Sequence, residues 1–99
     1  SAADTFSVTA KAMDNFTLMG LRTHGATGNI YDVSLSDGSK YTLSIMNCYG
    51  PNKKSIWNRG AEPDIEMWTT PEDLLSGEDT VLNAAIETLQ RQIKERTGE

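Results

Sequence analysis

Few residues of this chain could do chemistry, and the first of them is the serine that opens it. A serine hydroxyl attacks a carbonyl only when a base removes its proton and when donors stabilise the resulting oxyanion. Ser1 stands at the start of a predicted helix, with the amide of Ala2 beside it and the helix dipole behind it. The same placement is typical of an ordinary helix N-cap, which is what the pattern alone favours.

The remaining candidates have simpler structural interpretations. His24, the single histidine, lies in a glycine-rich loop, where it is either a site residue or a partly exposed loop residue. Glu62 and Asp64 resemble paired carboxylates, but Pro63 between them favours loop anchoring. A lysine base needs burial to lower its pKa, so we interpret the Lys53-Lys54 pair as a solvated turn.

The elements that must position these residues can be placed by apolar spacing and turn signals. They predict a helix over residues 2–13, a short buried strand over 16–21 and a tight loop over 22–28. The Asp37-Gly38 pair predicts a β-hairpin between strands over 30–35 and 41–46.

The last third of the chain is predicted to be mostly helical. Residues 65–68 could form a final short strand. Thr70 and Pro71 begin a short helix that Gly77 ends, and a longer helix covers about 79–96 with a stop at Gly98. The methionines and Trp68 are expected in the core rather than in a ligand site. This order predicts an α/β or α+β layer arrangement.

Composition limits the possible partners. The chain has 99 residues and a net charge of −5, and no apolar run reaches the roughly 18 residues of a membrane span. Residues 1–61 carry four acids and six bases, whereas residues 62–99 carry ten acids and three bases. The acidic half disfavours nucleic acid as a partner. The single cysteine, Cys48, excludes an internal disulfide and is expected to be at least half-buried.

Three blocks resemble the carboxyl-terminal processing, or tail-specific, serine peptidases, and their tricorn-like branch in particular. The first block, Ser1–Phe6, is similar to the family's nucleophile segment. The second, Gly20–Gly28, is similar to its Gly-x-x-Thr-x-Gly loop. The third joins the Glu-Pro-Asp motif at residues 62–64 to the helical segments from Thr70 onward.

The resemblance implies an α/β, crotonase-like (ClpP/crotonase-type) peptidase core. Residues 1–99 would form the C-terminal part of one core domain, in the order helix, strand, β-hairpin, short strand and C-terminal helix. The N-terminal part would be a separate segment of the same protein and a partner of this chain. A peptide or protein substrate, a possible homo-oligomer, and an exported location are further implications. No cofactor, metal, nucleic acid or membrane partner is expected.

The resemblance also assigns site residues. Ser1 would be the nucleophile and the Ala2 N–H an oxyanion donor, with Thr23, His24, Gly25, Ala26 and Gly28 forming the active-site loop. In the lysine-dyad branch a lysine occupies the position of Ala26, so this chain has no serine–lysine dyad. In the tricorn-like branch a distant histidine is the base, and a glutamate that helps to orient it occupies the position of Trp57. An indole cannot carry that negative charge.

Two functions therefore remain open. One is a serine endopeptidase that forms an acyl-enzyme on Ser1, with the base supplied by another segment. The alternative is a catalytically degenerate relative that binds peptide or protein without cleaving it, which Ala26 and Trp57 motivate. In either case the chain alone is expected to be inactive.

Overall fold

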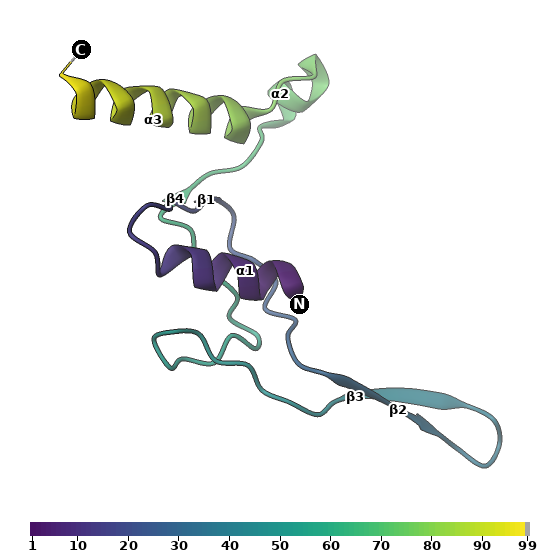
Figure 1. Ribbon diagram of the computed structural model, residues 1–99. Helices are drawn as coiled ribbons and strands as arrows, with labels where there is room; N and C mark the ends of the chain where they lie inside the picture. The colour runs from purple at the N-terminus through teal and green to yellow at the C-terminus, as the bar shows by residue number, and fades with distance from the viewer. Residues whose placement is uncertain (99) are drawn as a thin grey trace.

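A computed structural model describes residues 1–98, and its elements follow the predicted order (Figure 1). They are α1 (Ala2–Lys11), β1 (Met19–Gly20), β2 (Ile30–Ser34), β3 (Lys40–Ser44), β4 (Ile65–Glu66), α2 (Pro71–Ser76) and α3 (Thr80–Thr97). The mixed helix and strand content confirms the coarse α/β prediction.

The helix ends carry the residues that the sequence predicts for them. The Thr70 side chain accepts a hydrogen bond from the Asp73 amide at 3.1 Å, and α2 ends at Gly77 in the left-handed conformation. The Asp79 carboxylate accepts from the Leu82 amide at 2.9 Å, and Gly98 ends α3 in the same left-handed way. Local capping chemistry therefore fixes the bounds of both helices.

A short pair of parallel strands joins the segment that follows α1 to the segment that follows the Glu-Pro-Asp motif. β1 pairs with β4, with Met19 opposite Ile65. Asp64 extends this pairing, since its carboxylate accepts from the Leu18 amide at 2.8 Å and contacts Lys11 Nζ at 3.3 Å. The Leu18 hydrogen bond is the main reason that the pKa of Asp64 lies below its ordinary value. The predicted anchoring role of Asp64 is confirmed.

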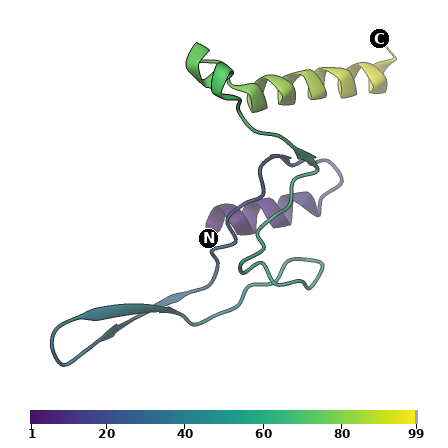
Figure 2. The ribbon, with the colours of Figure 1, turned by 180° about the vertical axis from the view of Figure 1, so that it is seen from behind.

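The β2–β3 hairpin projects away from α1 as a two-stranded arm (Figures 1 and 2). Its turn is the predicted Asp37-Gly38 turn, in which the Asp37 carboxylate accepts from the Ser39 amide at 2.9 Å. Apolar residues pair across one face, where Tyr31 lies opposite Leu43 and Val33 opposite Tyr41. The arm is therefore amphipathic, because its other face carries the Thr42–Asp32 hydrogen bond.

The chain is open rather than closed around one core. Its extents are 68 × 37 × 14 Å and its radius of gyration is 18.7 Å, whereas about 13 Å is typical of a compact domain of this length. The buried apolar side chains are small in number: Ala10, Ile56 and Ala61. They lie where α1 meets the loops around residues 25 and 60, and this junction is the best-packed part of the molecule.

Two predictions about the core are wrong for this chain. The predicted buried strand over 16–21 shortens to Met19–Gly20, and the flanking Phe16 and Leu21 are exposed. Met13, Met46 and Trp68 were expected in the core, but they are 50%, 49% and 58% exposed. Their exposure agrees with the open shape of the described part of the chain, whose smallest extent is 14 Å. Cys48 is half-buried, as predicted.

Residues 1–98 contain neither a membrane-spanning helix nor a cluster of metal-ligating side chains. No helix in this range combines the length and the apolarity needed to cross a membrane. Within the same range, no three His, Cys, Asp or Glu side chains gather closely enough to hold a metal ion.

Candidate active site

The N-terminal end of α1 places the predicted nucleophile near the glycine-rich loop. Ser1 is the N-cap of α1, and its side chain is 76% exposed. Ala2 is the first helical residue, and the N–H groups of a first helical turn have no partner inside the helix. The hydroxyl and a free amide are thus adjacent at one helix end, which is the arrangement that an acyl-transfer site uses.

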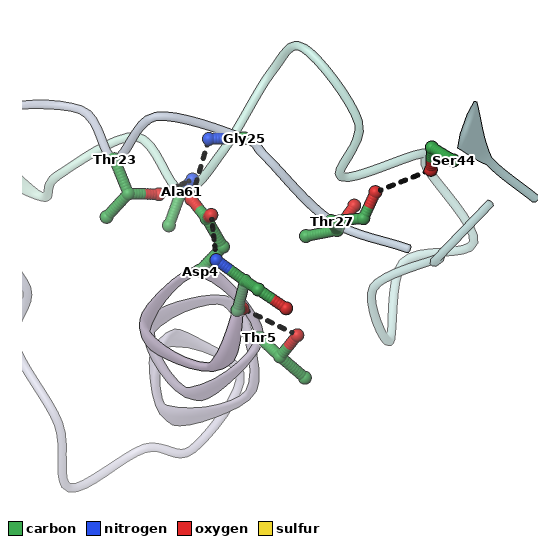
Figure 3. Close-up of polar contacts among 8 residues, drawn as sticks. Asp4, Thr5, Thr23, Gly25, Thr27, Ser44 and Ala61 are labelled. Atoms are coloured by element: carbon green, nitrogen blue, oxygen red, sulfur yellow. Dashed lines mark hydrogen bonds and ion pairs between the residues drawn. The ribbon is translucent and has the colours of Figure 1, made fainter. Parts of the chain in front are cut away.

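A buried carboxylate holds this helix end against the loop (Figure 3). Asp4 is 3% exposed, and its Oδ1 accepts from the Gly25 amide at 2.7 Å. Its Oδ2 accepts from the Ser1 nitrogen at 3.0 Å. One side chain therefore contacts both the backbone of the predicted nucleophile and the backbone of the loop.

A second set of hydrogen bonds joins the loop to the segment before the Glu-Pro-Asp motif. The Ala61 amide donates to Thr23 Oγ1 at 2.7 Å, and the Thr23 amide donates to the Ala61 carbonyl at 3.0 Å. The Asn58 amide donates to the Gly25 carbonyl at 2.8 Å. The first two blocks of the family resemblance therefore meet the segment that precedes the third, although the three are distant in sequence.

Hydrogen bonding at this point stabilises the charged form of Asp4. A hydrogen bond from the Thr23 side chain, followed by the bond from the Gly25 amide, lowers the pKa of Asp4 from 3.8 to about 2, against the opposing effect of burial. The Ser1 nitrogen contributes less than these two donors. The shift therefore depends mainly on the loop and only weakly on the charge of that nitrogen.

This shift predicts an acid-sensitive contribution to stability. The folded-state pKa lies below the unfolded value, so Asp4 stabilises the fold above about pH 4 and loses that effect as the pH falls towards 2. A shift of this size is worth on the order of 2 kcal/mol. Urea unfolding of the complete protein between pH 2 and pH 6 measures it. We expect Asp4→Asn to remove about this much of the pH dependence, and an unchanged slope in the variant would contradict the assignment.

The remaining predicted site residues lie outside this junction. His24 and Ala26 are exposed, and Trp57 is 57% exposed. Gly28 lies at the base of the hairpin arm, where an added Cβ would meet Ser44 Oγ at 2.5 Å. Within residues 1–98, then, the structure brings together Ser1, Ala2, Thr23 and Gly25, and it leaves His24 and Trp57 facing outward.

Gly25 is required at the junction for two reasons. Its φ is +79°, and an added Cβ would lie 2.6 Å from the Gly60 nitrogen and 2.7 Å from the Arg59 nitrogen. We expect Gly25→Ala to destabilise the complete protein by about 3 kcal/mol. Gly38→Ala is the matched control, because Gly38 has a φ of +88° but nothing within 4 Å of its added Cβ.

Gly38→Ala should lower the free energy of unfolding by only about 1 kcal/mol, because the added Cβ strains the backbone there but meets no neighbouring atom. Chemical denaturation of both variants gives the comparison. Equal losses for the two glycines would show that close packing at Gly25 is not what the junction needs.

Sequence reasoning missed Asp4 as the central residue of this site. In the sequence, Asp4 is only one residue of the Ser1–Phe6 block. A capping box places an acid at the third helical position, and Asp4 occupies that position after Ser1. That signal identifies Asp4 as a capping residue, but not its contact with Gly25, 21 residues further on.

The chain is similar to known proteins. The profile of peptidase family S41 matches residues 1–67. Mature CPAF is 32% identical to this chain. The match has a TM-score of 0.66 and covers 74% of this chain. A candidate peptidase from Parabacteroides merdae is 31% identical, with a TM-score of 0.72 over 81% of the chain. CPAF complexed with lactacystin matches at 32% identity and a TM-score of 0.67, over 74% of the chain and 15% of CPAF.

The chain spans a minor part of these relatives, namely 14% of mature CPAF and 25% of the Parabacteroides merdae protein. The search of curated proteins gave no match. The profile match nevertheless covers well over half of the chain, including Ser1, the glycine-rich loop and the Glu-Pro-Asp motif. This confirms the resemblance found in the sequence, and the chain belongs to peptidase family S41.

Proposed function

We propose that this chain carries the nucleophile of a serine endopeptidase. The observation that supports the proposal best is the contact of Asp4 with both Ser1 and Gly25. It holds the end of α1, with its exposed hydroxyl and free amides, beside the glycine-rich loop. The family membership supports a serine peptidase in general, and the residue roles below are our proposal.

In the proposed reaction the Ser1 hydroxyl attacks the carbonyl carbon of the scissile peptide bond. A base from another segment takes the hydroxyl proton, and the Ala2 N–H donates to the oxyanion of the tetrahedral intermediate. The C–N bond then breaks, the base returns the proton to the leaving amine, and Ser1 is left as an ester. Water hydrolyses that ester in a second round of the same proton transfers.

The base does not come from this loop in the proposed mechanism. Ala26 occupies the lysine position of the dyad branch, and His24 is exposed and makes no hydrogen bond to Ser1 among those of residues 1–98. By family resemblance we propose a histidine in a preceding segment. Thr23 and Gly25 act as positioning residues, since they hold Asp4 and touch no reacting atom.

We further propose that the chain is the C-terminal part of a crotonase-like core. The exposed apolar face of the hairpin arm would then be covered by the preceding segment of the same protein. The same segment would cover the exposed apolar side chains of α3, namely Leu82, Ile86, Leu89 and Ile93. An exported location and self-association follow from the family resemblance and remain proposals. Measuring the size of the complete protein in solution tests self-association directly.

Hydrolysis of a mixed peptide library by the complete protein tests the function. We expect cleavage that a serine-directed fluorophosphonate abolishes in a time-dependent manner. Because CPAF has been solved in complex with lactacystin, lactacystin is a second probe of the site. A complete, folded protein that cleaves nothing and reacts with neither probe would contradict the proposal.

Trp57 favours one alternative. The glutamate that would stabilise a protonated catalytic histidine is absent at this position, and the indole of Trp57 is 57% exposed. The alternative function is peptide or protein binding without cleavage. Peptide binding that Ser1→Ala leaves unchanged, with no turnover by the unmodified protein, would support this alternative instead.

A further inference from the structure

A basic cavity lies beside the second half of α1, the helix that Ser1 begins. It has a volume of about 580 Å³ and is enclosed by the second half of α1, residue 22 and the loop over residues 51–62. Its lining includes four basic side chains and a single acid: Lys11, Arg22, Lys54, Arg59 and Glu62. This concentration of positive charge contrasts with the net charge of −5 of the whole chain.

Three of the four cations are available to a ligand. Lys11 Nζ is occupied, since it donates to the Glu62 carbonyl at 2.6 Å and contacts Asp64 at 3.3 Å. Among the side chains of residues 1–98, the ion pair is that of Lys11 with Asp64. Arg22, Lys54 and Arg59 therefore face the cavity without a carboxylate partner from the described part of the chain.

The floor of the cavity is apolar and fixed. Ile56 and Ala61 are 3% exposed, and Val8 is half-buried on α1. The same loop segment is tied to the active-site loop through the Ala61–Thr23 hydrogen bonds. The cavity is therefore built on the same rigid junction that holds Ser1, so a ligand bound in it would have a defined position relative to the nucleophile.

We infer that this cavity is a substrate subsite that binds an acidic side chain of the peptide, an inference that rests on the proposed function. Arginine forks form paired hydrogen bonds with carboxylates, and a locally positive cavity raises the concentration of anionic segments. The apolar floor suits the methylene groups of glutamate. Since the rest of the chain is net negative, an acidic residue is attracted here and repelled elsewhere, which fixes the register of the peptide.

The distance from Ser1 sets the position of that residue in the substrate. Val8 and Lys11 follow Ser1 by seven and ten residues along α1, which is about 10 to 15 Å of helix. An extended peptide covers about 3.3 Å per residue. The acidic side chain is therefore expected about three to five residues from the cleaved bond.

Matched peptides test this subsite. One set carries a single glutamate at successive positions around the cleaved bond, and the other carries glutamine in the same place. For the complete protein we expect kcat/KM to favour glutamate by about tenfold, at one position only and less at high salt. The variant Arg22→Gln/Arg59→Gln should bring the glutamate-to-glutamine ratio close to one. Lys54→Gln should reduce the glutamate-to-glutamine ratio partly. This single variant still tests the subsite if the double variant does not fold.

The matched control is Arg91→Gln, because Arg91 is an exposed cation on α3 outside the cavity. It should retain the full preference for glutamate. Hydrolysis with no charge preference would overturn the subsite and leave the peptidase proposal standing. If neither peptide is cleaved, the peptidase proposal fails, and the affinity for a labelled glutamate peptide then decides the subsite separately.

A second copy of the chain is the competing occupant. Residues 62–79 contain seven acids and no base, so this segment of a neighbour could fill the same cavity. Sedimentation of the complete protein distinguishes the two. The substrate assignment would be overturned by a dimer that dissociates in the variant Arg22→Gln/Arg59→Gln while the glutamate-to-glutamine ratio of kcat/KM stays unchanged.

Discussion

Ser1→Ala is expected to lower the kcat of the complete protein by at least about 10⁴-fold, with little change in KM. Removing the nucleophile of a serine peptidase leaves only the residual catalysis of the oxyanion donors and of substrate binding. The Ser1 side chain is 76% exposed, so its loss costs the fold little packing. Steady-state kinetics on a cleavable peptide, together with an unfolding curve, measure the two effects separately.

Ser7→Ala is the matched control for that substitution. Ser7 lies on the same helix, is half-buried and makes no contact with the glycine-rich loop among the hydrogen bonds of residues 1–98. It should retain nearly full activity. If Ser1→Ala kept more than a tenth of the activity while folded, another residue would have to be the nucleophile.

Asp4→Ala is expected to have the second largest effect. The substitution leaves the Gly25 amide without its acceptor at a buried place and removes the acceptor of the Ser1 nitrogen as well. A buried polar group left unpaired costs about 1 to 3 kcal/mol. Since two donors are affected, we expect the free energy of unfolding to fall by about 3 kcal/mol.

Activity should fall along with stability. Without Asp4 the end of α1 is no longer held at the loop, and a displacement of about 1 Å at a reacting group can cost about 10²-fold in rate. Asp14→Ala is the control, because Asp14 is exposed and lies beyond the end of α1. Equal activity of the two variants, measured at a temperature where both are folded, would refute the positioning role of Asp4.

Local signals explain how much of the fold was predictable. Helix caps, the Asp37-Gly38 turn and apolar spacing act within a few residues, and each predicted helix and hairpin is present. The predicted strand over 16–21 is too long because its pairing covers only Met19 and Gly20, and Phe16 and Leu21 lie exposed outside that pairing. Its only strand partner within residues 1–98 is β4, two residues long.

Long-range contacts explain what was not predictable. The Asp4–Gly25 bond joins residues 21 apart, and the Ala61–Thr23 bond joins residues 38 apart. No periodicity encodes such pairs. The basic cavity has the same origin, since its cations come from α1, from the start of the glycine-rich loop and from the 51–62 segment. The family resemblance located the segments, and the structure identified the contacts between them.

The central claim is that the Ser1 hydroxyl is the reacting group. Labelling the complete protein with a fluorophosphonate, followed by digestion and mass spectrometry of the peptides, tests it most directly. We expect one adduct per chain, on the peptide that contains Ser1, and no adduct on any other serine. An active protein whose adduct maps to another residue, or whose Ser1 stays unmodified while activity is lost, would contradict the account.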